Sequence, residues 1–269
     1  MPIAASPAAP AAEHARRRAS GATAAKARAG RIVVGVGGWS FAPWRGLFYP
    51  EGLAQARELG YLSRALTSVE INSTFYGLQK PATFQRWHDE APDGFLFSVK
   101  APMFVSNRRD LAAGGDGIAR FLDSGVLRLG RKLGPVNWQL APGKRFDAAE
   151  IDAFLSMLPE ERDGVRLRHA IEVRHPSFAD LAFVRLARRH GVAIVVAGDA
   201  KYPQIANPTA GFAYLRIMGT SDARPKGYAP AALDRWAKRL RQIAEGQPVD
   251  GLTQVAESAA IAAGPRDVF

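Results

Sequence analysis

Hydrophobic and polar positions follow two repeating patterns along most of the chain. Short runs rich in β-branched residues alternate with longer stretches whose apolar residues recur about every 3.6 positions, as in amphipathic helices. The predicted strands cover 32–36, 68–72, 96–101, 135–140, 170–173, 192–197 and 212–217, and the predicted helices cover 53–65, 83–90, 117–129, 148–158, 178–189 and 231–244. This alternation predicts a parallel sheet, and seven such units favour a (β/α)8 barrel of the TIM type over an open sheet.

The eighth strand of this barrel is short in the sequence. Residues 247–264 are rich in Gly, Ala and Pro, and a strand-like run begins only at Arg266 and stops at Phe269. The final helix of the barrel pattern is missing, so we expect a poorly covered seam between the first and last strands. We interpret the chain as a truncated or frameshifted barrel.

Polar and apolar side chains lie on opposite faces of the predicted strands, because neighbouring residues in a strand point in opposite directions. In residues 68–72, Val69 and Ile71 share one face, and Glu70 and Asn72 share the other. The apolar face of a barrel strand packs against helices, so the polar face enters the lumen, where charged groups are costly unless they are paired or used. The other polar residues on the lumen side are Ser98, Lys100, Asn137, Gln139, Glu172, Arg174, Tyr214 and Arg216.

The composition is that of an ordinary globular protein, with 47% hydrophobic and 23% charged residues among 269. No apolar run approaches the roughly 20 residues that span a bilayer, and the start carries no pattern of an export signal. We therefore expect a cytoplasmic protein without a membrane partner. The absence of cysteine excludes disulfides, thiolate metal sites and thiol nucleophiles.

The excess of positive charge is uneven along the chain. Residues 1–31 contain six basic residues and one acidic residue, and thus carry about half of the formal net charge of +11. They are mostly Ala, Pro, Arg, Gly and Ser and cannot bury enough apolar surface to fold. We expect a disordered basic leader over 1–31, either a solvated segment or an arm that touches phosphates, followed by one barrel domain over 32–269.

Several motifs resemble those of one known family. They are Val-Gly-Gly-Trp-Ser at 36–40, Trp-Arg-Gly-Leu-Phe-Tyr-Pro at 44–50, Val-Glu-Ile-Asn-Ser-Thr-Phe-Tyr at 69–76 and Ile-Glu-Val-Arg-His-Pro-Ser at 171–177. Together they resemble the YecE-like family, the domain of unknown function numbered 72, from about Val34 to Phe269. The resemblance implies a TIM-barrel fold and no established reaction.

The predicted catalytic residues are Glu70, Glu172 and His175. Two carboxylates in one lumen suit general acid/base chemistry, because one can raise the pKa of the other. His175 follows the fifth strand and would serve as a proton shuttle, or as a metal ligand with Glu172 and Asp199. The alternatives are that the glutamates only pair with lumen cations and that the His175 ring caps a helix that starts near Ser177.

Three cations form a predicted anion clamp, namely Lys100, Arg174 and Arg216. The planar guanidinium groups match phosphate or carboxylate, although they could instead only balance the lumen glutamates. Aromatic residues on the first two loops could stack on a sugar or a base. The other predicted substrate-binding residues are Trp39, Asn72, Tyr76, Gln139 and Asp199.

These features predict an enzyme, a hydrolase or a lyase or isomerase, that acts on a small anionic substrate, phosphorylated or sugar-like. The sequence contains no organic cofactor motif, since the Gly35–Gly38 segment lacks a third glycine at the spacing of dinucleotide-binding loops. A site for a single divalent metal ion with oxygen ligands stays an alternative. The alternative is a nucleic-acid-binding barrel that either binds without chemistry or acts as a metal-assisted phosphodiesterase. Its phosphate contacts would come from the leader and from Arg108, Arg109, Arg235, Lys238, Arg239 and Arg241.

Overall fold

The computed structural model describes residues 28–224, 227–255 and 264–269. Most of the predicted leader, residues 1–27, therefore lies outside the described residues. No described helix is long and apolar enough to cross a membrane.

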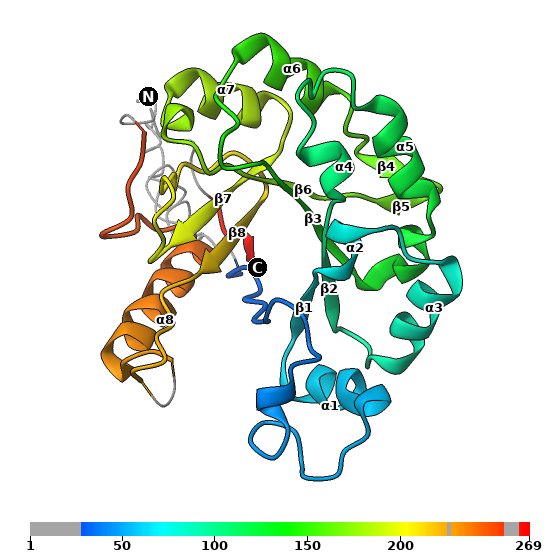
Figure 1. Ribbon diagram of the computed structural model, residues 1–269. Coiled ribbons are helices and arrows are strands. Elements are labelled where there is room, and N and C mark those ends of the chain that lie inside the picture. The colour runs from blue at the N-terminus through cyan, green and yellow to red at the C-terminus, as the bar shows by residue number, and fades with distance from the viewer. Residues whose placement is uncertain (1–27, 225–226, 256–263) are drawn as a thin grey trace, which may run out of the picture.

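A parallel sheet of seven strands forms the centre of the fold and curls strongly, with helices along its outer side (Figure 1). The order in the sheet is β1-β2-β3-β6-β7-β8-β9, so neighbouring strands follow one another along the chain. The strands are β1 Ser68–Ile71, β2 Leu96–Lys100, β3 Leu133–Gln139, β6 His169–Glu172, β7 Ala193–Gly198, β8 Phe212–Ile217 and β9 Asp267–Val268. The predicted parallel α/β architecture is confirmed, including a short strand at the end of the chain.

Most helices lie close to the positions that the apolar periodicity predicts. The predicted helix 117–129 is wrong as one helix, because it ends at Asp123 and Gly125, with a φ of 108°, separates it from a 3₁₀ segment. Side chains at their first turns help to fix where they begin: Asp147 accepts from the Glu150 N–H, Asp180 accepts from the Ala182 N–H, and Pro81 opens α3. The α-helices are α1 Glu58–Ala65, α2 Ser73–Tyr76, α3 Pro81–Glu90, α4 Met103–Ser106, α5 Gly115–Asp123, α6 Ala148–Ser156, α7 Leu181–Arg189 and α8 Pro230–Ala244. Short 3₁₀ turns are η1 Ala42–Trp44, η2 Gln55–Arg57, η3 Val126–Lys132 and η4 Pro176–Phe178, and the sequence did not predict the small hairpin of β4 Glu161–Arg162 and β5 Val165–Arg166.

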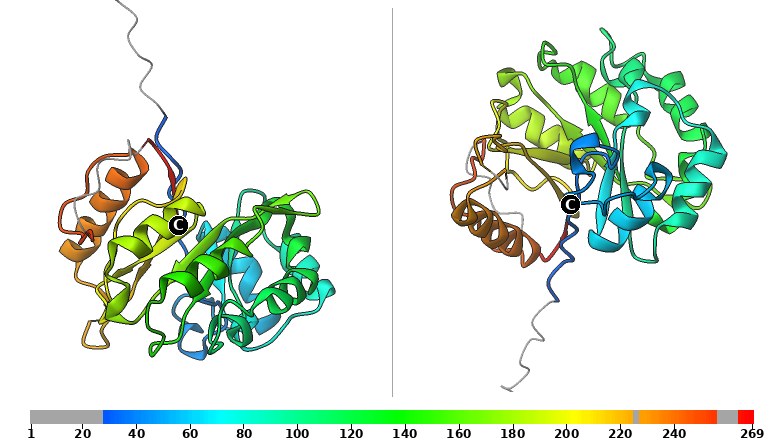
Figure 2. Two further views of the ribbon diagram at one scale, coloured as in Figure 1. Left: turned by 90° about the horizontal axis from the view of Figure 1, so that it is seen from above. Right: turned by 60° about the horizontal axis from the view of Figure 1, so that its bottom comes forward.

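The predicted first strand, 32–36, is wrong as a continuous strand. Ile32 forms a parallel bridge with Val268, and Gly37 forms one with Glu70. The Val33 N–H donates to the Val268 carbonyl at 2.8 Å, and the Glu70 N–H donates to the Val36 carbonyl at 2.9 Å. Residues 31–38 thus hydrogen-bond to β9 with their first half and to β1 with their second, and Figure 2 shows the C-terminal strand beside this segment.

Glycines explain why this segment is irregular. Gly35, Gly37 and Gly38 interrupt it, and glycine weakens a strand because it has no side chain to pack. A Cβ at Gly35 would lie 2.5 Å from the Ser68 carbonyl oxygen, so the segment approaches β1 more closely than another residue permits. The same glycines that make the close contact possible therefore prevent a regular ladder.

The outer face of the sheet carries the main hydrophobic core. Val69, Phe97, Val136 and Ile171 alternate with polar residues on their strands and are buried in this core. Their helix partners include Phe84, Phe121, Phe154 and Phe183, which are fully buried as well. The division of faces that the alternation predicts therefore holds for these strands, and the polar residues between them lie on the inner face.

Contacts at the end of β7 fix α8 against the sheet. Gly198 ends β7 next to Trp236 of α8, and a Cβ at Gly198 would lie only 2.6 Å from the indole ring. Asp199 follows in the left-handed region with a φ of 50°, which Asp adopts more readily than most residues. Its Oδ2 accepts a hydrogen bond from Trp236 Nε1 at 2.7 Å. These residues hold α8 to the end of β7.

Candidate functional site

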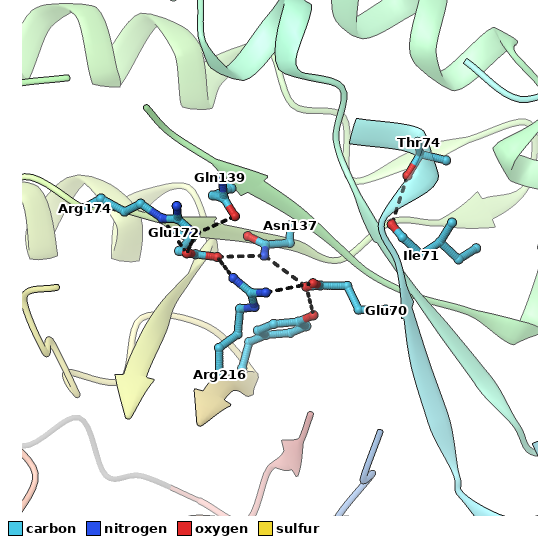
Figure 3. A network of polar contacts seen from close by, with 9 residues as sticks. Glu70, Ile71, Thr74, Asn137, Gln139, Glu172, Arg174 and Arg216 are labelled. Carbon is cyan, nitrogen blue, oxygen red and sulfur yellow. Dashed lines mark hydrogen bonds and ion pairs between the residues drawn. The ribbon is translucent and has the colours of Figure 1, made fainter. Parts of the chain in front are cut away.

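A buried network of charged and polar side chains lies on the inner face of the curled sheet (Figure 3). Its members come from β1, β3, β6 and β8 and from the residue two positions beyond Glu172. The parallel register places Lys100 beside Asn137 and Gln139 beside Glu172. The network consists of Glu70, Asn137, Gln139, Glu172, Arg174, Tyr214 and Arg216.

Glu172 is the centre of this network. Its Oε1 accepts from Arg174 Nη2 at 2.7 Å, and its Oε2 accepts from Arg216 Nη1 at 2.8 Å and from Asn137 Nδ2 at 3.2 Å. Burial by itself raises the pKa of Glu172, but Arg216 and Arg174 outweigh it and lower that pKa below its ordinary value. Glu172 therefore stays ionised and holds both arginines in place.

Glu70 is less completely paired. Its Oε2 accepts from the Tyr214 hydroxyl at 2.6 Å and from Asn137 Nδ2 at 3.2 Å. Its Oε1 lies 3.3 Å from Arg216 Nη2, yet this buried oxygen has no hydrogen-bond partner of acceptable geometry among the described residues. Glu70 thus keeps one oxygen fixed by neighbours and the other able to accept a proton or a hydrogen bond.

The partners of Glu70 keep their protons. Burial and the nearby Glu70 carboxylate raise the pKa of Tyr214 well above 10, so its hydroxyl remains a donor. Burial works against the charged form of Arg216, but Glu70 and Glu172 raise its pKa. Arg216 therefore remains a cation that bridges the two glutamates.

Lys100 is the cation without a carboxylate partner. Its side chain ends 4.4 Å from the centroid of the Phe75 ring, and no Asp or Glu of the described residues lies within ion-pair distance of it. Burial lowers the pKa of Lys100, the Glu70 charge opposes this, and Arg216 adds to the lowering. Among the described residues, Lys100, Arg174 and Arg216 face only Glu70 and Glu172, so the three cations exceed the two carboxylates of this site by one positive charge.

Of the other predicted site residues, Gln139 and Asn72 lie at or beside the network. Gln139 Oε1 accepts from Arg174 Nη2 at 2.8 Å. Asn72 lies against Gly37. A Cβ at Gly37 would be 3.1 Å from Asn72 Nδ2 and 4.0 Å from Glu70 Oε1. Asn72 therefore borders the network without a hydrogen bond to it among the described residues.

The remaining predicted residues lie elsewhere. His175 Nδ1 accepts from the Ser177 N–H at 3.2 Å and caps η4, as the structural alternative predicts. Asp199 bonds to Trp236 and Tyr228 instead of the network. Trp39 packs edge-to-face on Trp87, and Tyr76 is 76% exposed on α2. The structure does not join these four side chains to the glutamates.

Sequence reasoning missed two members of the network, Asn137 and Tyr214, as candidate site residues. Both lie on the inner face by strand alternation, which was the available signal. A cavity of about 400 Å³ borders the network and is lined in part by Glu70, Tyr214 and Arg216. The described residues contain no group of three or more His, Cys, Asp or Glu that could hold a metal ion.

Comparison with known proteins now gives the family. The sequence model of the family described as "Protein of unknown function DUF72" matches residues 33–264. The chain belongs to the DUF72 family. This confirms the YecE-like resemblance. The DUF72 chain is 31% identical to the UPF0759 protein YecE of Escherichia coli (strain K12) over 150 residues, which cover 55% of this chain and 50% of that protein. It therefore spans about half the length of the curated relative it matches.

Solved structures of the family share the fold of this DUF72 chain. A DUF72 family protein of Thermotoga maritima superposes with a TM-score of 0.60 and 23% identity, over 77% of this chain and 85% of that one. A DUF72 family protein of Enterococcus faecalis gives a TM-score of 0.62 and 16% identity, over 89% of both chains. At these identities the likeness concerns the fold alone.

Proposed function

We propose that this DUF72 protein is an enzyme of the (β/α)8 barrel type that acts by acid/base chemistry on a small anionic substrate, phosphorylated or sugar-like. The barrel interpretation is supported by residues 31–38, whose hydrogen bonds reach both β9 and β1, the two ends of the curled sheet. The inner network then lies in the lumen near the carboxyl ends of the strands, where barrel active sites occur. A soluble metabolite as substrate fits the cytoplasmic location that the composition predicts.

The observation that carries this proposal is the unbalanced charge of Lys100. A buried ammonium without a carboxylate partner is costly, and a bound anion would compensate it. Arg174 and Arg216 are already engaged by Glu172, so they are less free to clamp a substrate than the sequence predicts. In our proposal Lys100 makes the main contact with the substrate anion, and the arginines shape the site.

Glu70 is the proposed base. Its Oε1 can accept a proton from a substrate C–H or O–H group, while Tyr214 and Asn137 hold Oε2 in place. Returning that proton to a neighbouring atom completes an isomerisation, and losing a leaving group instead completes an elimination. Glu172 acts as a positioning residue for the arginines.

The nucleic-acid alternative requires a continuous basic surface. Arg235, Lys238 and Arg241 are exposed on α8, but Arg239 donates to the carbonyls of Asp250 and Gly251. The unbalanced cation of the site, in contrast, is buried on the inner face. This placement favours a small ligand over a polymer.

Thermal unfolding with inorganic phosphate tests the proposal. We expect phosphate to raise the Tm of the parent protein and of the control Lys238→Met, because a ligand that binds only the folded state stabilises it. Lys100→Met should fold, since no carboxylate in the described part of the chain lies within ion-pair distance of Lys100 to lose a partner. The Tm of this variant should not respond to phosphate. An undiminished response of Lys100→Met would contradict the proposal. Mass spectrometry of a copurified ligand would name the substrate class directly.

A further inference from the structure

A second cavity, of about 580 Å³, lies between α1, α3 and the loop that follows residue 37. None of its lining residues belongs to the charged network, although one of them, Asn72, borders that network. The lining residues that could contact a ligand are Trp39, Gln55, Asn72, Arg86, Trp87 and Glu90.

Two tryptophans form the apolar part of this cavity. The ring centroids of Trp39 and Trp87 are 5.3 Å apart with an interplanar angle of 85°. Leu59 is buried beside them, and Trp87 is 7% exposed. Because the two rings meet edge-to-face, they do not form a parallel slot for a flat base, but they offer apolar surface to a puckered ring.

The polar part of the cavity mixes donors and acceptors. Gln55 Nε2 donates to Ser40 Oγ. The amide oxygen of Gln55 can then accept a hydrogen bond from a ligand. Glu90 Oε1 accepts from the Gly60 N–H, and Arg86 supplies guanidinium donors from one turn earlier on α3. The buried Asn72 Oδ1 has no hydrogen-bond partner among the described residues. Hydroxyl groups, which both donate and accept, satisfy such a mixture.

The charges in the cavity favour a neutral ligand. Arg86 and Glu90 are its charged residues, and their charges cancel. From the aromatic surface, the mixed hydrogen-bonding groups and this balance, we propose that the cavity binds the ring of a neutral sugar. The proposal concerns a site outside the inner network and does not rest on the function proposed for that network.

Saturation-transfer NMR with free monosaccharides tests the inference. The probes are glucose, galactose, mannose, ribose and xylose, with adenosine as a comparison for nucleobase binding. We expect saturable binding of at least one sugar to the parent protein. Trp39→Ala should weaken that binding at least roughly tenfold, because it removes a large apolar contact. Arg86→Ala, which alters an exposed side chain and should not disturb folding, should weaken it by roughly fivefold.

Two control variants separate this site from the inner network. Trp44→Phe changes an indole outside the cavity and should leave sugar binding unchanged, as should Lys100→Met. The phosphate response of the Tm should persist in Arg86→Ala. The inference is overturned if no sugar binds, if adenosine binds where the sugars do not, or if sugar binding is unaffected by both Trp39→Ala and Arg86→Ala.

Discussion

The two faces of β3 and β6 bury polar groups in different ways. On the outer face Trp138 Nε1 donates to His169 Nδ1 at 3.1 Å, and His169 Nε2 donates to the Pro159 carbonyl at 2.8 Å. Phe121 and Phe154 pack on the same indole. Each of these three nitrogen atoms therefore has a partner within the protein, without any charge.

The inner face of the same strands is charged and incompletely paired. Asn137 and Glu172 join a network in which Glu70 Oε1 and Asn137 Oδ1 are buried without hydrogen-bond partners among the described residues. Lys100 has no carboxylate partner there either. The difference indicates that the outer pair serves the fold, whereas the inner groups are available to a ligand.

Among the variants that test the difference between the two faces, Glu172→Gln should lose the most stability. The change keeps the shape of the side chain but leaves Arg174 and Arg216 without their shared carboxylate, so we expect a loss of about 3 kcal/mol in the free energy of unfolding. Urea denaturation measures it. The control Glu161→Gln removes an exposed carboxylate on β4 and should have little effect. Equal stability of the two variants would contradict the conclusion that the inner face depends on charged pairs.

The outer pair predicts a dependence of stability on pH. Burial lowers the pKa of His169 to about 4, whereas an unfolded histidine titrates near 6.5, so protons bind preferentially to the unfolded state. This contribution is fully present above about pH 6.5 and is lost as the pH falls toward 4, by about 3 kcal/mol. His169→Gln can keep both hydrogen bonds but cannot titrate in this range. Its unfolding free energy should therefore fall less than that of the parent between these pH values, and parallel pH curves would contradict the assignment.

A smaller effect is expected from Tyr214→Phe on the inner face. It removes the hydroxyl that donates to Glu70 Oε2, while Asn137 still donates to the same oxygen. We therefore expect the free energy of unfolding to fall by about 1 to 2 kcal/mol. The same substitution at the exposed Tyr61 serves as the control in urea denaturation and should be nearly neutral. If Tyr214→Phe were as stable as Tyr61→Phe, the hydroxyl would not contribute to holding Glu70.

The smallest effect is expected from the exposed charges of α8. Replacing Arg235, Lys238 and Arg241 together by Gln should change Tm by no more than about 2 °C, because exposed charges contribute little to stability. The phosphate response should also persist, since these residues lie outside the inner network. Fluorescence polarisation with an oligonucleotide at moderate salt provides the second readout. Strong binding by the parent that the triple variant loses would support the nucleic-acid alternative.

The alternation of residue types predicted the strands and their two faces because both depend on local spacing. It placed Glu70, Lys100, Gln139, Glu172 and Arg216 on one face, and the structure brings Glu70, Gln139, Glu172 and Arg216 into one network. The pairing itself was not predictable, because Arg216 meets glutamates from two distant strands and their positions depend on the curl of the sheet. The free charge of Lys100 follows from that pairing.

The failures of sequence reasoning have local causes. Asp199 follows a predicted strand, but its positive φ turns the carboxylate toward Trp236 of α8. The predicted strand at 32–36 contains Gly35, and the segment bridges two different strands instead of pairing continuously with one. In both cases the local backbone conformation overrides the residue pattern around it.

The contact between Gly198 and Trp236 restricts the order in which this protein can change. A methyl group at 198 would collide with the indole while Trp236 is present, and shrinking the indole first would remove that barrier at the expense of its hydrogen bond to Asp199. The effect of an alanine at 198 therefore depends on which residue already occupies 236, a case of epistasis between the end of a strand and the middle of a helix. A change at Trp236 can therefore precede an alanine at Gly198, but the reverse order is unfavourable. The two residues should accordingly change together, or not at all, among sequences derived from this one.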